Sequence, residues 1–189
     1  VLCFYALNRI GAIASMIHPL SSVGEIAFYI KDSGSKAVVS LDAFYSKFEE
    51  VRRHVSFETL VLTSVKDALS PVMKLGFAVT EGRKVPKIPK DADVLYWNAF
   101  QRGAKKADES CFVARRGSDA AVILFSGGTT GTTKGILLSN LNFNALALQT
   151  CAMGHCVVPG ARMLAAMPMF HGFGLGVCIH TMLVAGVTA

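Results

Sequence analysis

Phe125-Ser-Gly-Gly-Thr-Thr-Gly-Thr-Thr-Lys-Gly135 is a segment rich in glycine and hydroxyl residues that follows the apolar run Ala120–Phe125. From Ser126 to Lys134 it holds three glycines, five hydroxyl side chains and one lysine. Because glycine tolerates positive φ, the backbone N–H groups can turn inward and approach a ligand closely. The hydroxyl donors and the lysine charge suit phosphate oxygens. We therefore predict a polyphosphate-binding loop, with a plain surface turn between two strands as the alternative.

The segment differs from the P-loop of nucleoside triphosphatases. That motif requires glycine at position 133 and a serine or threonine after the lysine, where this chain has Thr133 and Gly135. The apolar residues 136–138 follow, and they favour a second strand over a helix. We expect a strand–loop–strand cradle that binds phosphate through backbone N–H groups and side chains, with little help from a helix dipole.

The same segment resembles the phosphate-binding signature of the adenylate-forming (AMP-binding) superfamily, which includes acyl-CoA synthetases, luciferases and peptide-synthetase adenylation domains. That signature runs aromatic, Thr/Ser, Ser/Thr, Gly, Thr/Ser, Thr, Gly, any residue, Pro, Lys, Gly. Two positions differ, because Gly127 replaces a hydroxyl residue and Thr133 replaces the proline. The resemblance implies that Lys134 is catalytic and that the ATP phosphates bind to Ser126, Gly127, Gly128, Thr129, Thr130, Gly131 and Lys134.

Two further segments support the resemblance. The first, Met167-Pro-Met-Phe-His-Gly-Phe-Gly-Leu175, resembles the family's next motif, a Pro-x-Phe-His turn that follows a strand and opens a helix. The resemblance implies that His171 and Phe173 border the acyl substrate. The second, Ala6 to Val39, resembles the family's upstream helix–strand–helix–strand run. His18-Pro19-Leu20 stands where the family has a short loop containing proline. We interpret this upstream run as scaffold and assign none of its residues to the site.

Alternating helical and strand patterns predict an α/β fold with a largely parallel sheet covered by helices on both faces. Ser22 and Glu25 form a capping-box pair that opens one helix, and Gly34 stands at its end. Strands are expected at about 37–41, 59–63, 120–126, 135–138 and 162–167, and helices at about 23–33, 44–54 and 140–151. Ligands in such folds gather beyond the carboxyl ends of strands, where the 126–135 loop and the 168–173 turn would lie.

Both ends of the chain have the pattern of an internal segment. Val1 is no initiator methionine and opens an apolar helical pattern, and the apolar stretch 173–189 comes last. We therefore expect residues 1–189 to be part of the N-terminal domain of an adenylate-forming enzyme, truncated at both ends. The resemblance implies that the magnesium ligands, the ribose-binding aspartate and a C-terminal lysine lie beyond Ala189.

Basic charge is concentrated in the segment 66–116, which has eleven basic and six acidic residues. We interpret this segment as a basic, apolar-containing insertion within the domain, and it resembles that of bacterial medium- or long-chain fatty acid–CoA ligases. Residues 68–89 mix apolar and basic side chains, which leaves two interpretations open: a helix on an anionic bilayer surface, or a solvated insertion. No basic-aromatic platform is visible, so the pattern does not indicate nucleic-acid binding.

The cysteine pattern and the last residues bear on the location of the protein and on metal binding. The chain has five cysteines without a C-x-x-C pair and no secretory pattern, so we predict reduced thiols and a cytoplasmic location. Association with a membrane stays open. Cys151, His155 and Cys156 have no fourth partner, so we predict no metal site in this chain. The apolar stretch 173–189 is short and contains His180 and three glycines, which favours a buried helix over a bilayer span.

The resemblance implies a reaction in two steps. ATP would activate a fatty acid to an acyl-adenylate with release of pyrophosphate, and coenzyme A would then displace AMP to give acyl-CoA. Two alternatives stay open: an adenylation domain that loads a carrier protein, and a nucleotide-binding homologue that has lost catalysis. We expect the segment 1–189 alone to be inactive, because half of the implied site lies outside it.

Overall fold

The computed structural model describes residues 1–104, 107–126, 133–154 and 157–189. These residues form two compact units, of which the first joins Val1–His18 to Glu109–Ala189 and the second is Pro19–Asp108. In chain order, the first unit contains α1 (Leu2–Arg9), β1 (Ala14–Met16), the 3₁₀ turn η4 (Glu109–Cys111), β5 (Ala120–Ser126), β6 (Lys134–Ser139), α6 (Asn140–Met153), the π-helix η5 (Phe173–Thr181) and α7 (Met182–Val184).

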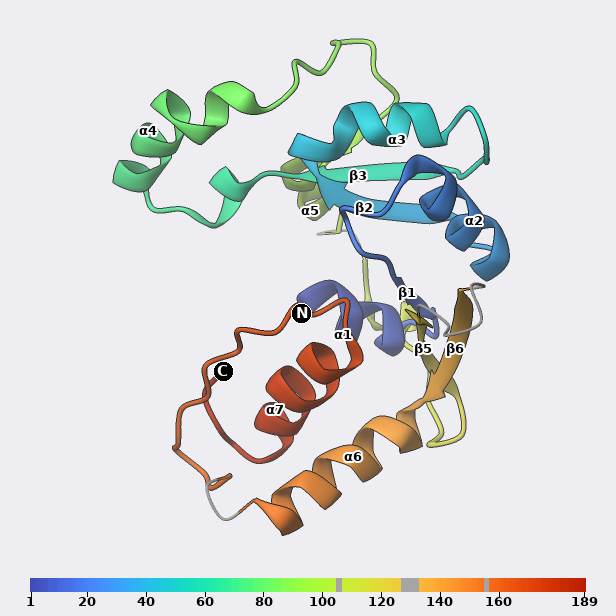
Figure 1. Ribbon diagram of the computed structural model, residues 1–189, viewed down its shortest axis with the longest axis vertical. Coiled ribbons are helices and arrows are strands. Elements are labelled where there is room, and N and C mark those ends of the chain that lie inside the picture. Colours follow the sequence, from blue (N-terminus) through green and yellow to red (C-terminus); the bar gives the residue numbers. More distant parts are fainter. Residues whose placement is uncertain (105–106, 127–132, 155–156) are drawn as a thin grey trace. The chain divides into compact units, whose positions relative to one another are not determined.

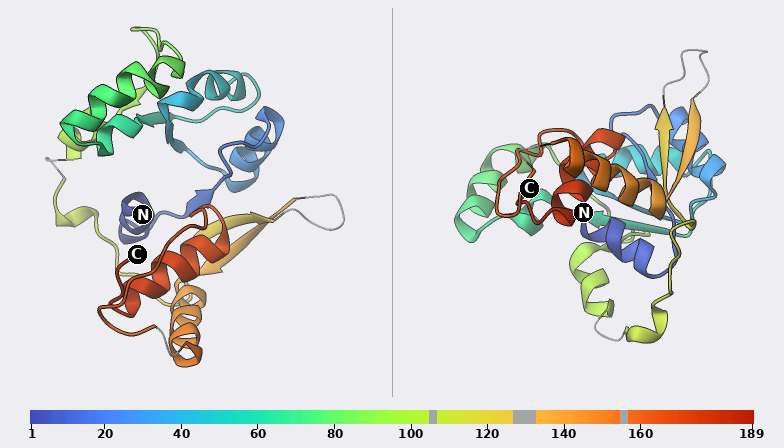
Figure 2. Two further views of the ribbon diagram at one scale, coloured as in Figure 1. Left: turned by 60° about the vertical axis from the view of Figure 1, so that its left-hand side comes forward. Right: turned by 90° about the horizontal axis from the view of Figure 1, so that it is seen from below.

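The first unit is built on a three-stranded sheet with the order β1-β5-β6 (Figure 1). Strand β1 runs parallel to β5, with Met16 opposite Leu124. Strand β6 runs antiparallel to β5, with Lys134 opposite Ser126. Figure 2 shows β5 (yellow) and β6 (orange) side by side along their length in both views. The two strands predicted on either side of the glycine-rich segment are therefore confirmed.

Strand β6 passes into α6 without a connecting loop. Ser139 is the last strand residue and also the N-cap of α6, where its hydroxyl accepts from the Asn142 N–H at 3.3 Å and its own N–H donates to Asn142 Oδ1 at 2.8 Å. The Asn140 N–H donates to the carbonyl oxygen of Asp119, just before β5, at 3.0 Å. Satisfying the free N–H groups of the first helical turn fixes where the helix begins. The start of α6 is thus bonded to the residue that precedes β5, at the end of the hairpin opposite the glycine-rich segment.

The core of the first unit lies where α1, the sheet and the two later helices meet. Its buried side chains are Phe4, Ala14, Val122, Phe143 and Leu175. Helix α6 approaches η5 closely, because a Cβ added at Gly176 would lie 2.7 Å from Leu146 Cδ2. The π-helix η5 continues into α7, and Figure 1 shows this helix beside α6. The buried helix predicted after residue 173 is confirmed, and it ends at Val184.

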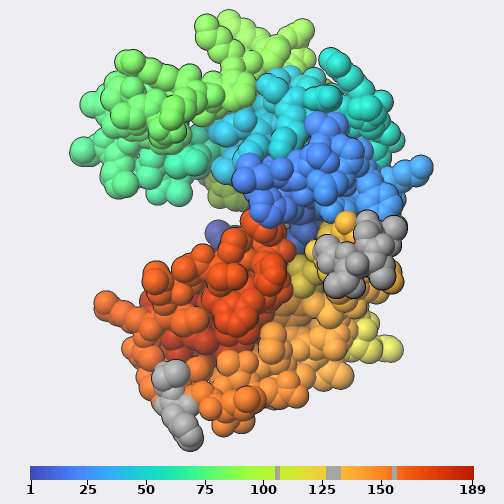
Figure 3. Space-filling view, in the orientation of Figure 1, coloured from blue at the N-terminus to red at the C-terminus, as the bar shows by residue number. Residues whose placement is uncertain are grey.

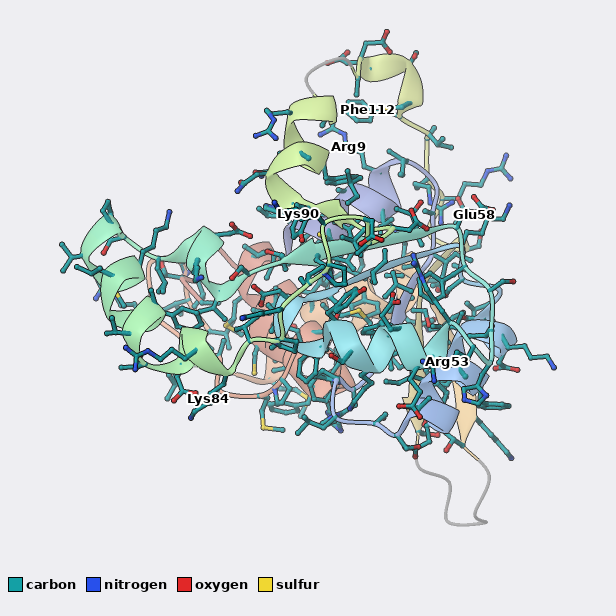
Figure 4. The ribbon with its side chains drawn as sticks, turned by 90° about the horizontal axis from the view of Figure 1, so that it is seen from above. Arg9, Arg53, Glu58, Lys84, Lys90 and Phe112 are labelled. Carbon is teal, nitrogen blue, oxygen red and sulfur yellow. The ribbon has the colours of Figure 1, made fainter. Side chains whose placement is uncertain are left out.

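The segment after residue 108 returns to the first unit through contacts with α1. The Arg9 guanidinium lies 4.0 Å from the centroid of the Phe112 ring, and Figure 4 shows the two side chains side by side. The Val113 N–H donates to the Arg9 carbonyl oxygen at 3.0 Å. A cation over an aromatic face and a backbone hydrogen bond together hold this segment against the end of α1.

The second unit contains the helix α2, a parallel sheet and residues 66–108 of the basic segment. Its elements are α2 (Val23–Ser33), β2 (Ala37–Leu41), η1 (Asp42–Phe44), α3 (Tyr45–Val51), β3 (Thr59–Thr63), η2 (Val65–Ala68), α4 (Pro71–Val79), η3 (Glu81–Lys84), β4 (Leu95–Tyr96) and α5 (Trp97–Ala104). The strands have the order β2-β3-β4 and all run parallel. The central residues 60–62 of β3 are buried, and Figure 4 shows α3 and α5 on opposite sides of that strand.

The predicted helix 23–33 and its caps are confirmed. The Ser22 hydroxyl accepts from the Glu25 N–H at 3.3 Å, and the Ser22 N–H donates to Glu25 Oε2 at 2.8 Å. Gly34 has φ 61°, a left-handed conformation that glycine adopts at little cost. The Lys47 ammonium donates to the carbonyl oxygens of Pro19 and Ser21, which fixes the loop before the helix.

The predicted α/β class is confirmed, with three differences in detail. The strands divide between two sheets, and β6 is antiparallel to its neighbour. The helix expected at 44–54 starts as a 3₁₀ turn and ends at Val51. The strand expected at 162–167 is wrong, because only an isolated parallel bridge forms, between Arg162 and Thr188. Beyond it the backbone turns, with the Ala166 N–H donating to the Leu164 carbonyl oxygen at 2.9 Å.

The basic segment 66–116 contributes to the second sheet through β4, which pairs with β3. None of the nine residues of α4, all of which the structure describes, is buried, and the same holds for the eight residues of α5, whereas α2 and α3 each bury apolar side chains. Within the described ranges, no helix has both the length and the apolar character needed to cross a bilayer. The interpretation of 66–116 as an insertion stays a prediction.

Candidate functional site

The ends of the predicted phosphate loop are held together by the β5–β6 pairing. Ser126 is the last residue of β5 and lies opposite Lys134, the first residue of β6. Residues paired across an antiparallel ladder have Cα atoms about 4.5–5.5 Å apart. Ser126 is half-buried and Lys134 is exposed. Among the described residues Lys134 takes part in no ion pair, so its charge is available to an anion.

The centre of the predicted loop is not described. Gly127, Gly128, Thr129, Thr130 and Gly131 lie outside the described residues, so their part in binding phosphate stays a prediction. What the structure does describe is the position from which the loop leaves and to which it returns, at the carboxyl end of β5.

The turn at 168–173 packs against the same end of the same strand. The His171 N–H donates to the Pro168 carbonyl oxygen at 3.0 Å, which closes the turn. A Cβ added at Gly172 would lie 3.2 Å from Leu124 Cδ1, two residues before Ser126. A Cβ at Gly174 would collide with the Pro168 carbonyl oxygen, so the close approach of turn and helix requires glycine there. The turn is therefore fixed by backbone packing beside the phosphate loop.

The two predicted acyl-site residues, His171 and Phe173, are exposed on this turn. The Phe173 N–H donates to His171 Nδ1 at 3.3 Å. A neutral imidazole that accepts at Nδ1 carries its proton on Nε2, so His171 presents one N–H donor away from its own backbone. The turn thus offers a polar donor and an aromatic ring side by side.

Sequence reasoning missed His18, which we had interpreted as scaffold. His18 is the last residue of the first of the two segments that make up the first unit, and it follows the end of β1 by two residues. Its ring centroid lies 4.2 Å from that of Phe170, inside the 168–173 turn. The available signal was a polar ring two residues after a short, partly buried strand that ends beside β5. That signal is weak without knowledge of which strands pair.

A second group of polar side chains lies toward the other end of β5, around a cavity of about 300 Å³ between α1 and α6. The Tyr5 hydroxyl bonds His180 Nδ1 at 3.0 Å, and His180 Nε2 bonds Asn144 Oδ1 at 3.1 Å. The Asn8 side-chain amide donates to Asn140 Oδ1 at 2.7 Å. Burial raises the pKa of Tyr5 and lowers the pKa of His180. These groups satisfy one another, as is typical of a structural network.

The described residues offer no protein site for a metal ion. Within the described ranges, no three His, Cys, Asp or Glu side chains are grouped so that they could hold one. Of the weak candidates named above, His155 and Cys156 lie outside the described residues. None of the four described cysteines is part of a disulfide. Mg²⁺ with ligands outside this chain stays a prediction.

Comparison with known proteins agrees with the resemblance to the adenylate-forming superfamily. The family model described as AMP-binding enzyme matches residues 1–189. The chain is 26% identical over 177 residues to the long-chain-fatty-acid–CoA ligase of Bacillus subtilis, covering 93% of this chain and 32% of that protein. It is 29% identical over 195 residues to the long-chain-fatty-acid–CoA ligase of Haemophilus influenzae, covering 100% of this chain and 34% of that protein. These relatives confirm the resemblance drawn from the three sequence segments.

Solved structures show the same fold at lower identity. The anthranilate CoA ligase AuaEII in complex with anthranoyl-AMP matches with a TM-score of 0.76 at 20% identity, covering 98% of this chain and 31% of that one. The ATP-bound MatB of Rhodopseudomonas palustris matches with a TM-score of 0.69 at 20% identity, covering 98% and 31%.

The chain spans about a third of the length of the curated relatives it matches. Within that third, the hairpin that carries Ser126 and Lys134 and the turn beside it are the segments in which the sequence resembles the adenylate-forming signatures. The match of the family model over all 189 residues shows that this chain belongs to the AMP-binding enzyme family.

Proposed function

We propose that the whole protein is a fatty acid–CoA ligase. A carboxylate oxygen of the fatty acid attacks the α-phosphorus of ATP, the bond to the leaving pyrophosphate breaks, and an acyl-adenylate forms. The sulfur of coenzyme A then attacks the acyl carbonyl carbon, and AMP leaves. The observation that carries the proposal is the pairing of Ser126 with Lys134 at the end of β5, beside a turn that packs on Leu124.

The β5–β6 hairpin binds the phosphates of ATP in this proposal. Charge builds on the β- and γ-phosphates as pyrophosphate departs, and a fixed cation close to that charge lowers the barrier. Lys134 is exposed at the start of a paired strand, so its backbone is fixed while its ammonium can reach the phosphates. The Ser126 hydroxyl, opposite Lys134, supplies a donor from the other strand. Both groups act by binding and orienting ATP.

The turn at 168–173 binds the fatty acid in this proposal. The Nε2–H of His171 can donate to a carboxylate oxygen, and the half-exposed ring of Phe173 offers apolar surface to an acyl chain. Met169, on the same turn, packs against the apolar core. A site with one donor and mostly apolar surroundings favours a carboxylic acid with a hydrocarbon tail over a polar amino acid.

A chain-length series on the whole protein tests the substrate class. Pyrophosphate release should rise from acetate toward medium- and long-chain acids, because each buried methylene contributes about 0.8 kcal/mol. Preference for acetate or for a polar amino acid would contradict the fatty-acid assignment.

The same assay separates the two alternatives. Acyl transfer to a carrier protein but not to coenzyme A would identify a loading domain. ATP binding without pyrophosphate release for any acid would identify a homologue without catalysis.

We further propose that α4 contacts an anionic membrane surface. Its apolar side chains Val72, Met73, Leu75 and Val79 are 52–82% exposed, which is unusual for a helix of a monomeric protein. Lys74 lies within the helix, and Arg83 and Lys84 follow it. Figure 3 shows the α4 segment (green) at the surface. Exposed apolar side chains with basic neighbours fit the interface of a bilayer with anionic headgroups.

Vesicle sedimentation tests this contact on the whole protein. We expect binding to vesicles of phosphatidylglycerol and weaker binding to phosphatidylcholine, with a loss at high salt. The double variant Val72→Ser with Leu75→Ser should lower the bound fraction severalfold. Leu164→Ser is the matched control, because Leu164 is 84% exposed outside α4. Equal binding by both variants would contradict the proposal.

A further inference from the structure

His18 lies where the two halves of the proposed site meet. Strand β1 pairs with β5 up to Met16 opposite Leu124, and His18 lies two residues beyond Met16. Ser126, where the phosphate loop begins, likewise lies two residues beyond Leu124. Because the two strands are parallel, both residues stand at the same edge of the sheet. His18 therefore stands at the same sheet edge as Ser126, although the two are far apart in the sequence.

The ring of His18 contacts the turn that presents His171. The centroids of the His18 and Phe170 rings are 4.2 Å apart, with an interplanar angle of 55°. Aromatic pairs at such distances attract each other beyond the area that they bury. Phe170 directly precedes His171, so a shift of the Phe170 ring moves the residue that follows it. One side of the turn is thus fixed by Leu124 against Gly172, and the other by His18 against Phe170.

We propose that His18 is a positioning residue for the acyl substrate. It holds Phe170, and through Phe170 it sets the place of His171 and Phe173 relative to the start of the phosphate loop. This inference rests on the proposed function for its link to the substrate, but the positioning itself is a property of the fold. The phosphate side is held separately, by the pairing of Ser126 with Lys134. Loss of the His18 ring should therefore affect the acid and spare ATP.

Three variants of the whole protein test the inference by kinetics. His18→Ala should raise the KM for the fatty acid about 3- to 10-fold, the range that the loss of one aromatic pair implies. The KM for ATP should stay within about twofold, because the hairpin is unchanged. His18→Phe keeps a ring and should restore the KM for the acid. His54→Ala is the matched control, since His54 is exposed in the other unit.

Parallel increases in both KM values, or no change in either, would overturn the inference, and so would a failure of His18→Phe to restore the KM. Amide hydrogen exchange supplies a readout that needs no activity. His18→Ala should speed exchange of the His171 and Leu175 amides, which donate to Pro168 and His171 in the native turn. His18→Phe and His54→Ala should not.

Unchanged exchange in His18→Ala would overturn the positioning role even if the protein acts on another substrate. An inactive wild type with faster exchange in His18→Ala would instead refute the proposed function alone.

Discussion

The two ends of strand β5 carry polar residues in opposite ways. Toward its first residues, Tyr5, His180 and Asn144 bond one another across three helices. At its last residue, Ser126 stands opposite an exposed Lys134, and the exposed His171 lies on a turn packed against the strand. At the first end these three side chains are hydrogen-bonded to one another within the protein. At the second, the side chains of Lys134 and His171 are exposed, and we assign them to an external partner.

The difference separates the residues that hold the fold from those that remain available for chemistry. A partly buried polar network stabilises because its groups bond one another, and the loss of one group removes the bonds of its partners. An exposed cation at the end of a paired strand adds little to stability but lies ready for an anion. Substitutions at the two ends should therefore have opposite signatures, one in rate and the other in stability.

The largest effect is expected at the carboxyl end. Lys134→Ala in the whole protein should slow acyl-adenylate formation by about 10²-fold or more, because a fixed cation no longer offsets the charge on departing pyrophosphate. Its melting temperature should stay close to that of the wild type. Binding of preformed acyl-adenylate, which lacks the β- and γ-phosphates, should change little. Lys31→Ala, another exposed lysine, is the control. Equal losses of adenylate formation and of acyl-adenylate binding would make Lys134 a structural residue.

Packing of the turn is the next largest effect. Gly174→Ala places a methyl group against the Pro168 carbonyl oxygen and should lower the free energy of unfolding by about 2–3 kcal/mol. Gly117→Ala is the matched control in the same unit, because its Cβ would meet Leu141 Cβ at an ordinary 3.6 Å. Urea denaturation followed by circular dichroism measures both. A Gly174→Ala variant as stable as Gly117→Ala would mean that the turn is held loosely, contrary to its assigned role.

The opposite signature is expected at the partly buried network of Tyr5, His180 and Asn144. His180→Ala removes the bonds to Tyr5 and Asn144 and should lower the free energy of unfolding by about 1–2 kcal/mol. The rate per folded molecule should stay unchanged, since His180 touches none of the proposed site residues named here. A large fall in rate without a loss of stability would erase the contrast between the two ends of β5.

The smallest effect concerns pH. Burial lowers the pKa of His180 below its ordinary value of 6.5, so the unfolded chain binds a proton that the folded protein resists. Stability should therefore be full above about pH 6.5 and decline as the pH falls from there toward the folded pKa. His180→Asn should flatten this part of the curve. Urea midpoints measured in steps between pH 7.5 and about pH 5 make the comparison, and an equal slope in both proteins would assign the dependence to other groups.

Local signals predicted the parts of the fold that depend on neighbouring residues. The Ser22–Glu25 capping box and Gly34 marked both ends of α2, and an apolar run marked β5. Pairing over long distances was harder to predict. The three-residue β1 exists because β5 lies beside it, and 162–167 stays irregular because its apolar pattern finds a single bridge.

The candidate site divides in the same way. Sequence resemblance led to Ser126, Lys134, His171 and Phe173, because each belongs to a contiguous motif. The contact of His18 with Phe170 joins residues from opposite ends of the chain, and no contiguous pattern encodes it. The β5–β6 ladder also shifts register between Ala120 and Val122, an irregularity that a strand pattern alone does not reveal.

The direct passage of β6 into α6 has a consequence for how this family can vary. Lys134 opens the strand and Ser139 both ends it and caps the helix, so the interval between them is fixed by two structures at once. Inserting or deleting one residue in this interval would turn the lysine to the other face of the strand or move the helix off its cap. Natural length variation among relatives should therefore avoid this interval and collect elsewhere. Within the six residues from Lys134 to Ser139, we therefore expect relatives to differ in side chains but not in the number of residues.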